Sequence, residues 1–150
     1  MLYAPTRSIM RAGMDGSSPV TVVSGFYGAY GLTIDFKTSK LFWADVGGKV
    51  ESSNFQGGDR RAVVQNQSGG PYGIAVANDR VYWGEYRGKK LKSSTTTGED
   101  IIVLHSDTSN IRHITLVPNF YLPQNRTNHC AGHTCAKVCV LTAASFRCLD

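Results

Sequence analysis

Short stretches of alternating apolar and polar residues run through the first 124 residues of the chain. Within residues 32–37 every second residue is apolar, and Ile74 and Val76 alternate with polar or small neighbours in the same way. A period of two is typical of half-buried β-strands. Turn-forming sequences rich in glycine separate these stretches, as at residues 56–59 and 97–99. No apolar stripe of helical period occurs, so the sequence predicts an all-β fold.

The predicted strands repeat at a spacing of about 41 residues. Equivalent residues at this spacing are Ile9, Val50 and Leu91, and likewise Gly16, Gly57 and Gly98. The motif Leu41-Phe-Trp-Ala-Asp45 is matched 40 residues later by Val81-Tyr-Trp-Gly-Glu85. Each unit contains four predicted strands, which is the number in one blade of a β-propeller.

Charge and composition exclude several classes of protein. The 150 residues include 16 Lys and Arg against 11 Asp and Glu, and these charges are spread along the chain. Nucleic-acid binding needs a dense basic stripe, so no nucleic-acid partner is expected. No apolar run approaches the ~18 residues of a membrane span, and the first residues do not resemble a secretory signal. No membrane contact is expected of this segment.

All four cysteines lie in the last 21 residues, which predicts a second, small module over residues 125–150, after a first domain over residues 1–124. These cysteines are Cys130, Cys135, Cys139 and Cys148. So short a stretch needs disulfides or a metal to hold it together. Disulfides are favoured over zinc, although His129 and His133 lie close by, because no Cys-x2-Cys pair is present. Two glycosylation candidates, Asn66 and Asn125, favour an extracellular setting.

The repeat motifs resemble those of a known family. Phe42-Trp-Ala-Asp45 and Tyr82-Trp-Gly-Glu85 are similar to the Tyr-Trp-Thr-Asp repeat of the six-bladed propellers in the low-density-lipoprotein (LDL) receptor family, a repeat that also occurs in nidogen. The cysteine spacing from Cys130 resembles the epidermal-growth-factor-like (EGF-like) module that follows each propeller in that family. A ring of six blades needs roughly 240 residues. The chain is therefore interpreted as the C-terminal blades of an incomplete propeller, about three in number, followed by a truncated EGF-like module.

The resemblance implies roles for particular residues. It implies the disulfides Cys130–Cys139 and Cys135–Cys148, although four cysteines by themselves allow three pairings. It also implies structural roles in the repeat: the glycines lie in the innermost strands, the tryptophans fill the space between blades, and the acids accept hydrogen bonds from backbone of a neighbouring blade. These residues are Gly31, Gly73, Trp43, Trp83, Asp45 and Glu85.

The function implied by the resemblance is binding without catalysis. No catalytic motif is found, and neither a cofactor nor a metal is predicted. The resemblance implies a ligand-binding or structural segment on the extracellular side of a single-pass endocytic or signalling receptor. Its partners would be a lipoprotein, a yolk protein, a secreted signal or neighbouring receptor modules. The alternative is a secreted, nidogen-like matrix protein that binds other matrix proteins through its propeller.

One cluster of side chains is particular to a single repeat and is a candidate partner contact. It comprises Tyr86, Arg87, Lys89, Lys90 and Lys92. The equivalent stretch one repeat earlier, residues 45–52, carries one lysine and two acids instead. A requirement of the repeat would occur in both copies. Two interpretations remain open, a contact for an acidic partner and a solvated loop without a partner.

Overall fold

The computed structural model describes residues 1–106 and 109–116, together with the backbone of residues 138–141 and 146–149. In these residues every regular element is a strand and no helix occurs. The strands are β1 (Leu2–Tyr3), β2 (Ser8–Arg11), β3 (Val20–Ser24), β4 (Ala29–Asp35), β5 (Lys40–Asp45), β6 (Lys49–Asn54), β7 (Arg61–Val64), β8 (Pro71–Ala77), β9 (Arg80–Glu85), β10 (Leu91–Thr95), β11 (Ile102–His105), β12 (Val138–Leu141) and β13 (Phe146–Leu149). The predicted all-β class is confirmed.

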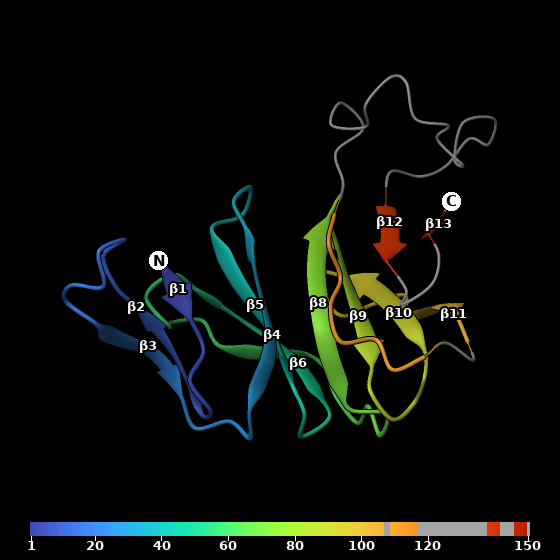
Figure 1. Ribbon diagram of the computed structural model, residues 1–150, viewed down its shortest axis with the longest axis horizontal. Helices are drawn as coiled ribbons and strands as arrows, with labels where there is room; N and C mark the ends of the chain where they lie inside the picture. The colour runs from blue at the N-terminus through green and yellow to red at the C-terminus, as the bar shows by residue number, and fades with distance from the viewer. Residues whose placement is uncertain (107–108, 117–137, 142–145, 150) are drawn as a thin grey trace.

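Three antiparallel sheets lie side by side in Figure 1, in the order in which the chain forms them. We call them the first blade (β1–β3), the second blade (β4–β7) and the third blade (β8–β11). The second and third blades each have four strands in chain order, as the repeat predicts. The first blade has three strands, and its β1 is an edge. This arrangement of sheets is that of a β-propeller.

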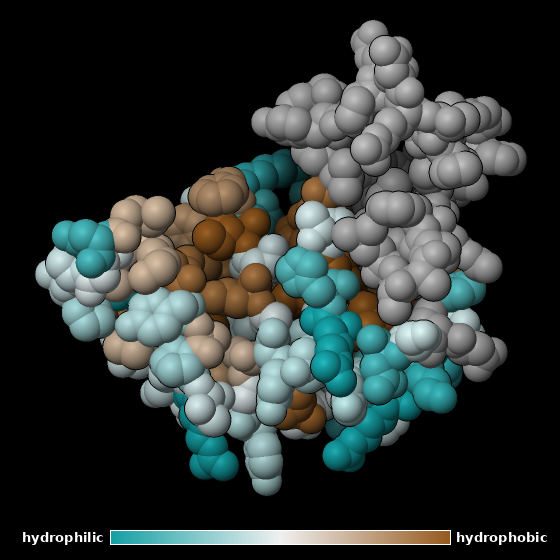
Figure 2. Space-filling view, viewed as in Figure 1, coloured by the Kyte–Doolittle hydropathy of each residue, from teal (hydrophilic) through white to brown (hydrophobic). Residues whose placement is uncertain are grey.

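The second strand of each four-stranded blade is buried on both faces. Residues 41–45 of β5 and residues 81–85 of β9 are all buried, whereas a strand with one wet face would alternate. Neighbouring blades cover both faces. Trp43 packs with Ile9 and Val23 of the first blade, and Trp83 packs with Val50 and Val63 of the second. Figure 2 shows apolar residues gathered in the middle of the molecule, with polar residues around them.

Glycine allows the inner strands to approach each other. A Cβ on Gly31 of β4 would overlap the carbonyl oxygen of Tyr72 in β8 and lie 3.0 Å from the backbone nitrogen of Ile74. A Cβ on Gly73 of β8 would lie 2.9 Å from the backbone nitrogen of His113. Residues 111–116 therefore lie against β8 in the same way that β8 lies against β4. They occupy the position at which the inner strand of a next blade would lie.

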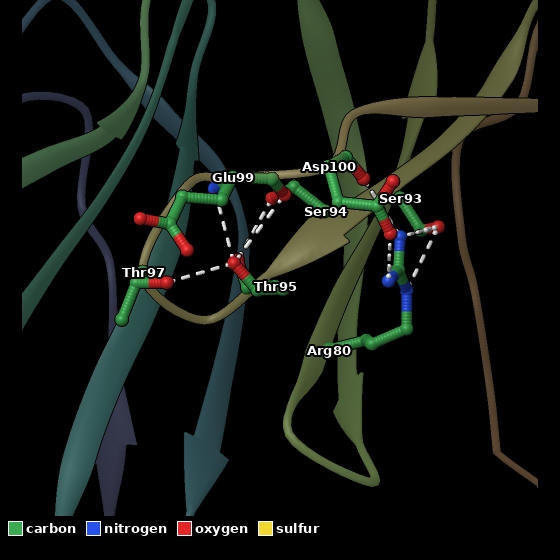
Figure 3. Close-up of polar contacts among 7 residues, drawn as sticks. All are labelled: Arg80, Ser93, Ser94, Thr95, Thr97, Glu99 and Asp100. Carbon is green, nitrogen blue, oxygen red and sulfur yellow. Dashed lines mark hydrogen bonds and ion pairs between the residues drawn. The ribbon is translucent and has the colours of Figure 1, made fainter.

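The turns between the third and fourth strands share one backbone form. Gly57 and Gly98 have φ of 84° and 96°, and Asp59 and Asp100 have φ of 54° and 51°. Positive φ favours glycine and, among other residues, Asp and Asn. Figure 3 shows the polar contacts that hold the third-blade turn. Thr95 Oγ1 accepts a hydrogen bond from Glu99 N at 3.0 Å, and Arg80 Nη1 pairs with Asp100 Oδ2 at 2.8 Å.

The hairpin of β12 and β13 is described by its backbone alone. Its antiparallel register places Cys139 opposite Cys148. Asn125, Cys130 and Cys135 lie outside the described residues. The disulfide pairing, the EGF-like module and the boundary at residue 125 thus stay predictions.

The described residues contain no helix that is long and apolar enough to cross a membrane.

Candidate functional site

The side chain of Asp45 makes hydrogen bonds to two loops at one end of the blades. Its carboxylate accepts hydrogen bonds from Gly28 N at 3.2 Å and Tyr27 N at 3.4 Å, in the loop between β3 and β4. It also accepts one from Gly47 N at 3.0 Å, in the turn between β5 and β6. These donors belong to the loop that leads into the blade of Asp45 and to its own β5–β6 turn, so the predicted contact with backbone of a neighbouring blade stays a prediction. The buried carboxylate holds the backbone beneath Tyr27, whose side chain lies on the surface.

Three tyrosines form a row across the second and third blades at this same end. The rings of Tyr30 and Tyr72 stack with centroids 4.5 Å apart, and those of Tyr72 and Tyr86 lie 5.5 Å apart. The Arg112 guanidinium lies 5.7 Å from the centroid of Tyr86. We call Tyr30, Tyr72, Tyr86 and Arg112 the tyrosine row. The start of β4, the start of β8 and the turn after β9 bring it together.

The tyrosine row reaches the surface at Tyr30, and Tyr27, in the loop before β4, is exposed as well. Tyr30 is 56% exposed and Tyr27 is 72% exposed. The Arg7 guanidinium lies 5.8 Å from the centroid of the Tyr27 ring. Tyrosine offers a large, rigid apolar surface with a hydroxyl at its tip, and arginine stacks on its face. Side chains of these two types are enriched in protein–protein contacts.

Three basic side chains of the predicted cluster are exposed beside the tyrosine row. Arg87, Lys89 and Lys90 lie in the turn between β9 and β10, which follows Tyr86 directly. The backbone of this turn is held against the preceding loop, since Arg87 N donates to Gly69 O at 2.8 Å. We call Arg87, Lys89 and Lys90 the basic turn.

Lys92 does not belong to this exposed surface, so its place in the predicted cluster is corrected. Its ammonium pairs with Glu85 Oε1 at 2.6 Å and donates to Gln67 Oε1 at 2.9 Å. The side chains of Lys92 and Glu85 are only 17% and 3% exposed. Lys92 in β10 lies directly opposite the buried Trp83 of β9. The aliphatic part of the Lys92 side chain therefore lies in the interior and not on the exposed turn.

Glu85 and Asp45 hold the same place in their repeats and have different partners. Whereas Asp45 accepts hydrogen bonds from backbone, the Glu85 carboxylate pairs with Lys92. Gly69 and Gly88 lie against this carboxylate, where a Cβ on either would overlap it. Glutamate is one methylene longer than aspartate, so the Glu85 carboxylate lies further from its backbone and reaches the Lys92 ammonium in the same blade.

Sequence reasoning found Tyr86 and missed the rest of the tyrosine row. A signal was present, because Tyr30 and Tyr72 each come directly before the glycine of their repeat. Arg112 holds the corresponding place before His113. Asn66, the glycosylation candidate, is exposed in the loop between β7 and β8. Among the residues that the structure describes, no cluster of His, Cys, Asp or Glu could hold a metal ion.

The relatives of the chain include a vitellogenin receptor and a low-density lipoprotein receptor-related protein. No family model matches the chain. It is 30% identical to the vitellogenin receptor Yl of Drosophila melanogaster over 139 residues, covering 89% of this chain and 7% of that protein. It is 34% identical to human low-density lipoprotein receptor-related protein 5 over 144 residues, covering 93% of this chain and 9% of that protein. The chain is a homologue of the LDL-receptor-related proteins. This LDL-receptor-related segment spans less than a tenth of the length of either relative.

Two solved structures have the same arrangement of sheets as the LDL-receptor-related segment. It superposes on a chain of the nidogen/laminin complex with a TM-score of 0.65 and 23% identity, over 73% of this chain and 44% of that one. It also superposes on a luciferin-regenerating enzyme with a TM-score of 0.62 and 14% identity, over 75% of this chain and 41% of that one. At these identities the likeness concerns the fold alone. The propeller expected from the repeat is confirmed.

Proposed function

We propose that this chain is a non-catalytic, ligand-binding segment on the extracellular side of a single-pass LDL-receptor-related receptor. The tyrosine row beside the basic turn is the observation that carries this function. The relatives named above are receptors, and receptor segments act by presenting a surface to a protein ligand. The names of these relatives favour a receptor over a secreted, nidogen-like matrix protein.

The geometry supports a contact with a protein that carries acidic side chains. Tyr30 and Tyr72 offer stacked rings that a ligand can cover, and the three cations of the basic turn lie at the end of the row. No acidic side chain of the row or of the turn offsets these cations, because Glu85 is buried against Lys92. Aromatic area would supply affinity, and the cations would select an acidic partner and speed its association.

The ligand class follows from this chemistry. An acidic segment of a lipoprotein, a yolk protein, a secreted signal or a neighbouring receptor module would fit the row and the turn. The alternative, a solvated loop without a partner, predicts that neither part of the surface affects binding.

The experiment measures binding of purified vitellogenin and of heparin to the chain and to two variants. One variant replaces Arg87, Lys89 and Lys90 by Ser, and the other carries Tyr30→Ala. We expect the triple variant to lose most of the salt dependence, because exposed charges are screened within ~10 Å at 0.1 M salt. We expect Tyr30→Ala to weaken vitellogenin binding about tenfold or more, as for residues that dominate interfaces.

A matched control is Phe36→Ala, because Phe36 is also an exposed aromatic residue, at 80%, in the turn after β4 at the other end of the blades. This variant should bind as the unaltered chain does. If both test variants keep the affinity and the salt dependence for vitellogenin and heparin, this surface is not the ligand site.

A further inference from the structure

Acidic side chains divide unequally between the two ends of the blades. At the end that carries the tyrosine row, the described carboxylates are those of Asp45 and Glu85, and both are buried. Every exposed carboxylate among the described residues lies at the opposite end, in the turns that join β2 to β3, β6 to β7, β8 to β9 and β10 to β11. These residues are Asp15, Asp59, Asp79, Glu99 and Asp100.

Cations occur at both ends, and at the opposite end carboxylates offset them. There Lys37 pairs with Asp79 at 2.7 Å, and Arg80 pairs with Asp100 at 2.8 Å. By contrast, Lys49 and the three cations of the basic turn are exposed, and no described carboxylate pairs with them. The end that carries the tyrosine row is therefore cationic at its surface. We call Lys49 together with the basic turn the cationic face.

The two parts of the cationic face belong to different blades and lie side by side. Lys49 is the first residue of β6 in the second blade, and the basic turn joins β9 to β10 in the third. One loop contacts both turns, because Gln67 N donates to Gly48 O at 3.0 Å and Arg87 N donates to Gly69 O at 2.8 Å. The three residues from Gln67 to Gly69 span at most about 10 Å of backbone. One ligand can therefore reach both turns.

Lys89 has a backbone conformation that costs the basic turn conformational free energy. Its φ is 49°, whereas the equivalent residue 41 positions earlier is Gly48, with φ of 91°. Positive φ suits glycine, and long side chains rarely adopt it. The other non-glycine residues with positive φ in the described part of the chain are all Ser, Asp or Asn. Strain of this kind is typical of positions where the side chain has a function. Glycine would form this turn at less cost, so what lysine adds is its charge.

We infer that the partner is an extended acidic segment of a polypeptide that lies across both turns, so that its carboxylates contact Lys49 as well as the basic turn. This inference rests on the proposed function and extends its contact from one turn to two blades. The stacked rings of Tyr30 and Tyr72 cross the same two blades beside the cations. A polypeptide is favoured over a sulfated glycan because it supplies apolar side chains that can cover these rings.

Fluorescence anisotropy with two oligoglutamate probes tests the inference on the 150-residue chain secreted from eukaryotic cells. A twelve-residue oligoglutamate extends to about 40 Å and a three-residue one to about 10 Å, so only the longer probe can cover both turns. We expect Lys49→Ser to weaken binding of the longer probe about threefold, as for one exposed ion pair, and to change binding of the shorter probe little. Lys37→Ser is the matched control, because Lys37 is an exposed lysine at the opposite end, and this variant should keep its affinity.

Lys89→Gly separates the charge of Lys89 from the form of the turn. We expect the midpoint of thermal unfolding to rise, because glycine adopts positive φ without strain. The affinity for the longer probe should fall about threefold in the same variant. A variant that is more stable and keeps its affinity overturns the role of Lys89, and a lower midpoint overturns the strain on which that role is argued.

The outcomes separate this inference from the proposed function. If replacement of the basic turn by serine weakens binding of the longer probe and Lys49→Ser does not, the proposed function stands and the contact across two turns is wrong. If neither change affects binding, both are wrong. Binding of heparin without binding of either oligoglutamate also overturns the inference, because the partner would then be a sulfated glycan.

Discussion

Trp43 donates its indole hydrogen to Glu51 across the β5–β6 pair, with 3.1 Å between Nε1 and Oε2. Arg60 Nη2 pairs with the same carboxylate oxygen at 2.7 Å. Its guanidinium lies 5.7 Å from both the Trp43 and the Phe26 rings. The buried donor and the buried acid thus satisfy each other, and an arginine covers them. In the third blade Trp83 has no such partner, because Lys92 stands opposite it and no acceptor among the described residues meets its buried Nε1.

The first prediction compares the two tryptophans. Trp43→Phe and Trp83→Phe remove the same volume from equivalent places, but only Trp43→Phe breaks a hydrogen bond to a charged group. Such a bond contributes about 1.5–3 kcal/mol. We expect Trp43→Phe to lower the free energy of unfolding by about that amount more than Trp83→Phe, in urea titrations followed by far-ultraviolet circular dichroism. Equal losses would contradict the role of the Trp43–Glu51 bond.

Four positions differ together between the second and third blades. The first set belongs to the second blade and the loop that leads into it, and comprises Phe26, Asp45, Glu51 and Arg60. The equivalent residues of the third blade and its loop are Gln67, Glu85, Lys92 and Ile101. In the first set the Glu51 carboxylate accepts a hydrogen bond from the Trp43 indole and pairs with Arg60. In the second set a lysine joins a glutamate and a glutamine at 2.6 Å and 2.9 Å. Each set is consistent within itself, so a single exchange between them should destabilise the fold.

The second prediction tests this with Lys92→Glu. The change restores the residue type of the second blade but places a carboxylate beside Glu85, which is almost fully buried. Loss of one partner from a buried ion pair costs about 3–5 kcal/mol. We expect a loss of unfolding free energy in this range. Lys90→Glu makes the same change of charge at an exposed position in the turn between β9 and β10, and it should cost no more than about 0.5 kcal/mol.

The third prediction concerns the approach of the inner strands. Gly31→Ala forces a Cβ into the backbone of β8, which cannot move as a flexible side chain can. Overpacking of this kind costs about 1–3 kcal/mol. Gly28→Ala is the control, because the nearest atoms to its Cβ lie at 3.4 Å, an ordinary contact distance. Thermal unfolding should show a clearly lower midpoint for Gly31→Ala and little change for Gly28→Ala.

The fourth prediction concerns the cysteines. The resemblance implies the disulfides Cys130–Cys139 and Cys135–Cys148. Peptide mapping of secreted, non-reduced protein should recover these two cross-linked pairs. The register that places Cys139 opposite Cys148 makes a bridge between those two the sharpest rival. Recovery of that bridge, or of four free thiols, would remove the support for an EGF-like module.

Much of the fold was predictable because the repeat shows it several times. Gly57 and Gly98, or Trp43 and Trp83, occur at matching places, and a pattern repeated along the chain is visible without knowledge of contacts. Strand number, strand order within a blade and the burial of the aromatic strands follow from it. The basic turn was visible for the same reason, since Arg87, Lys89 and Lys90 depart from the preceding copy.

What the sequence by itself determined was the local chemistry of each blade: alternating strands, glycine turns and aromatic second strands, which depend on neighbours along the chain. Only the tertiary structure decided which side chains meet across blades. It stacked the ring of Tyr30 on that of Tyr72, and it paired Lys92 with Glu85 away from the exposed basic turn. The reason is physical, because a contact between blades joins residues about 40 positions apart whose distance is set by how the sheets pack.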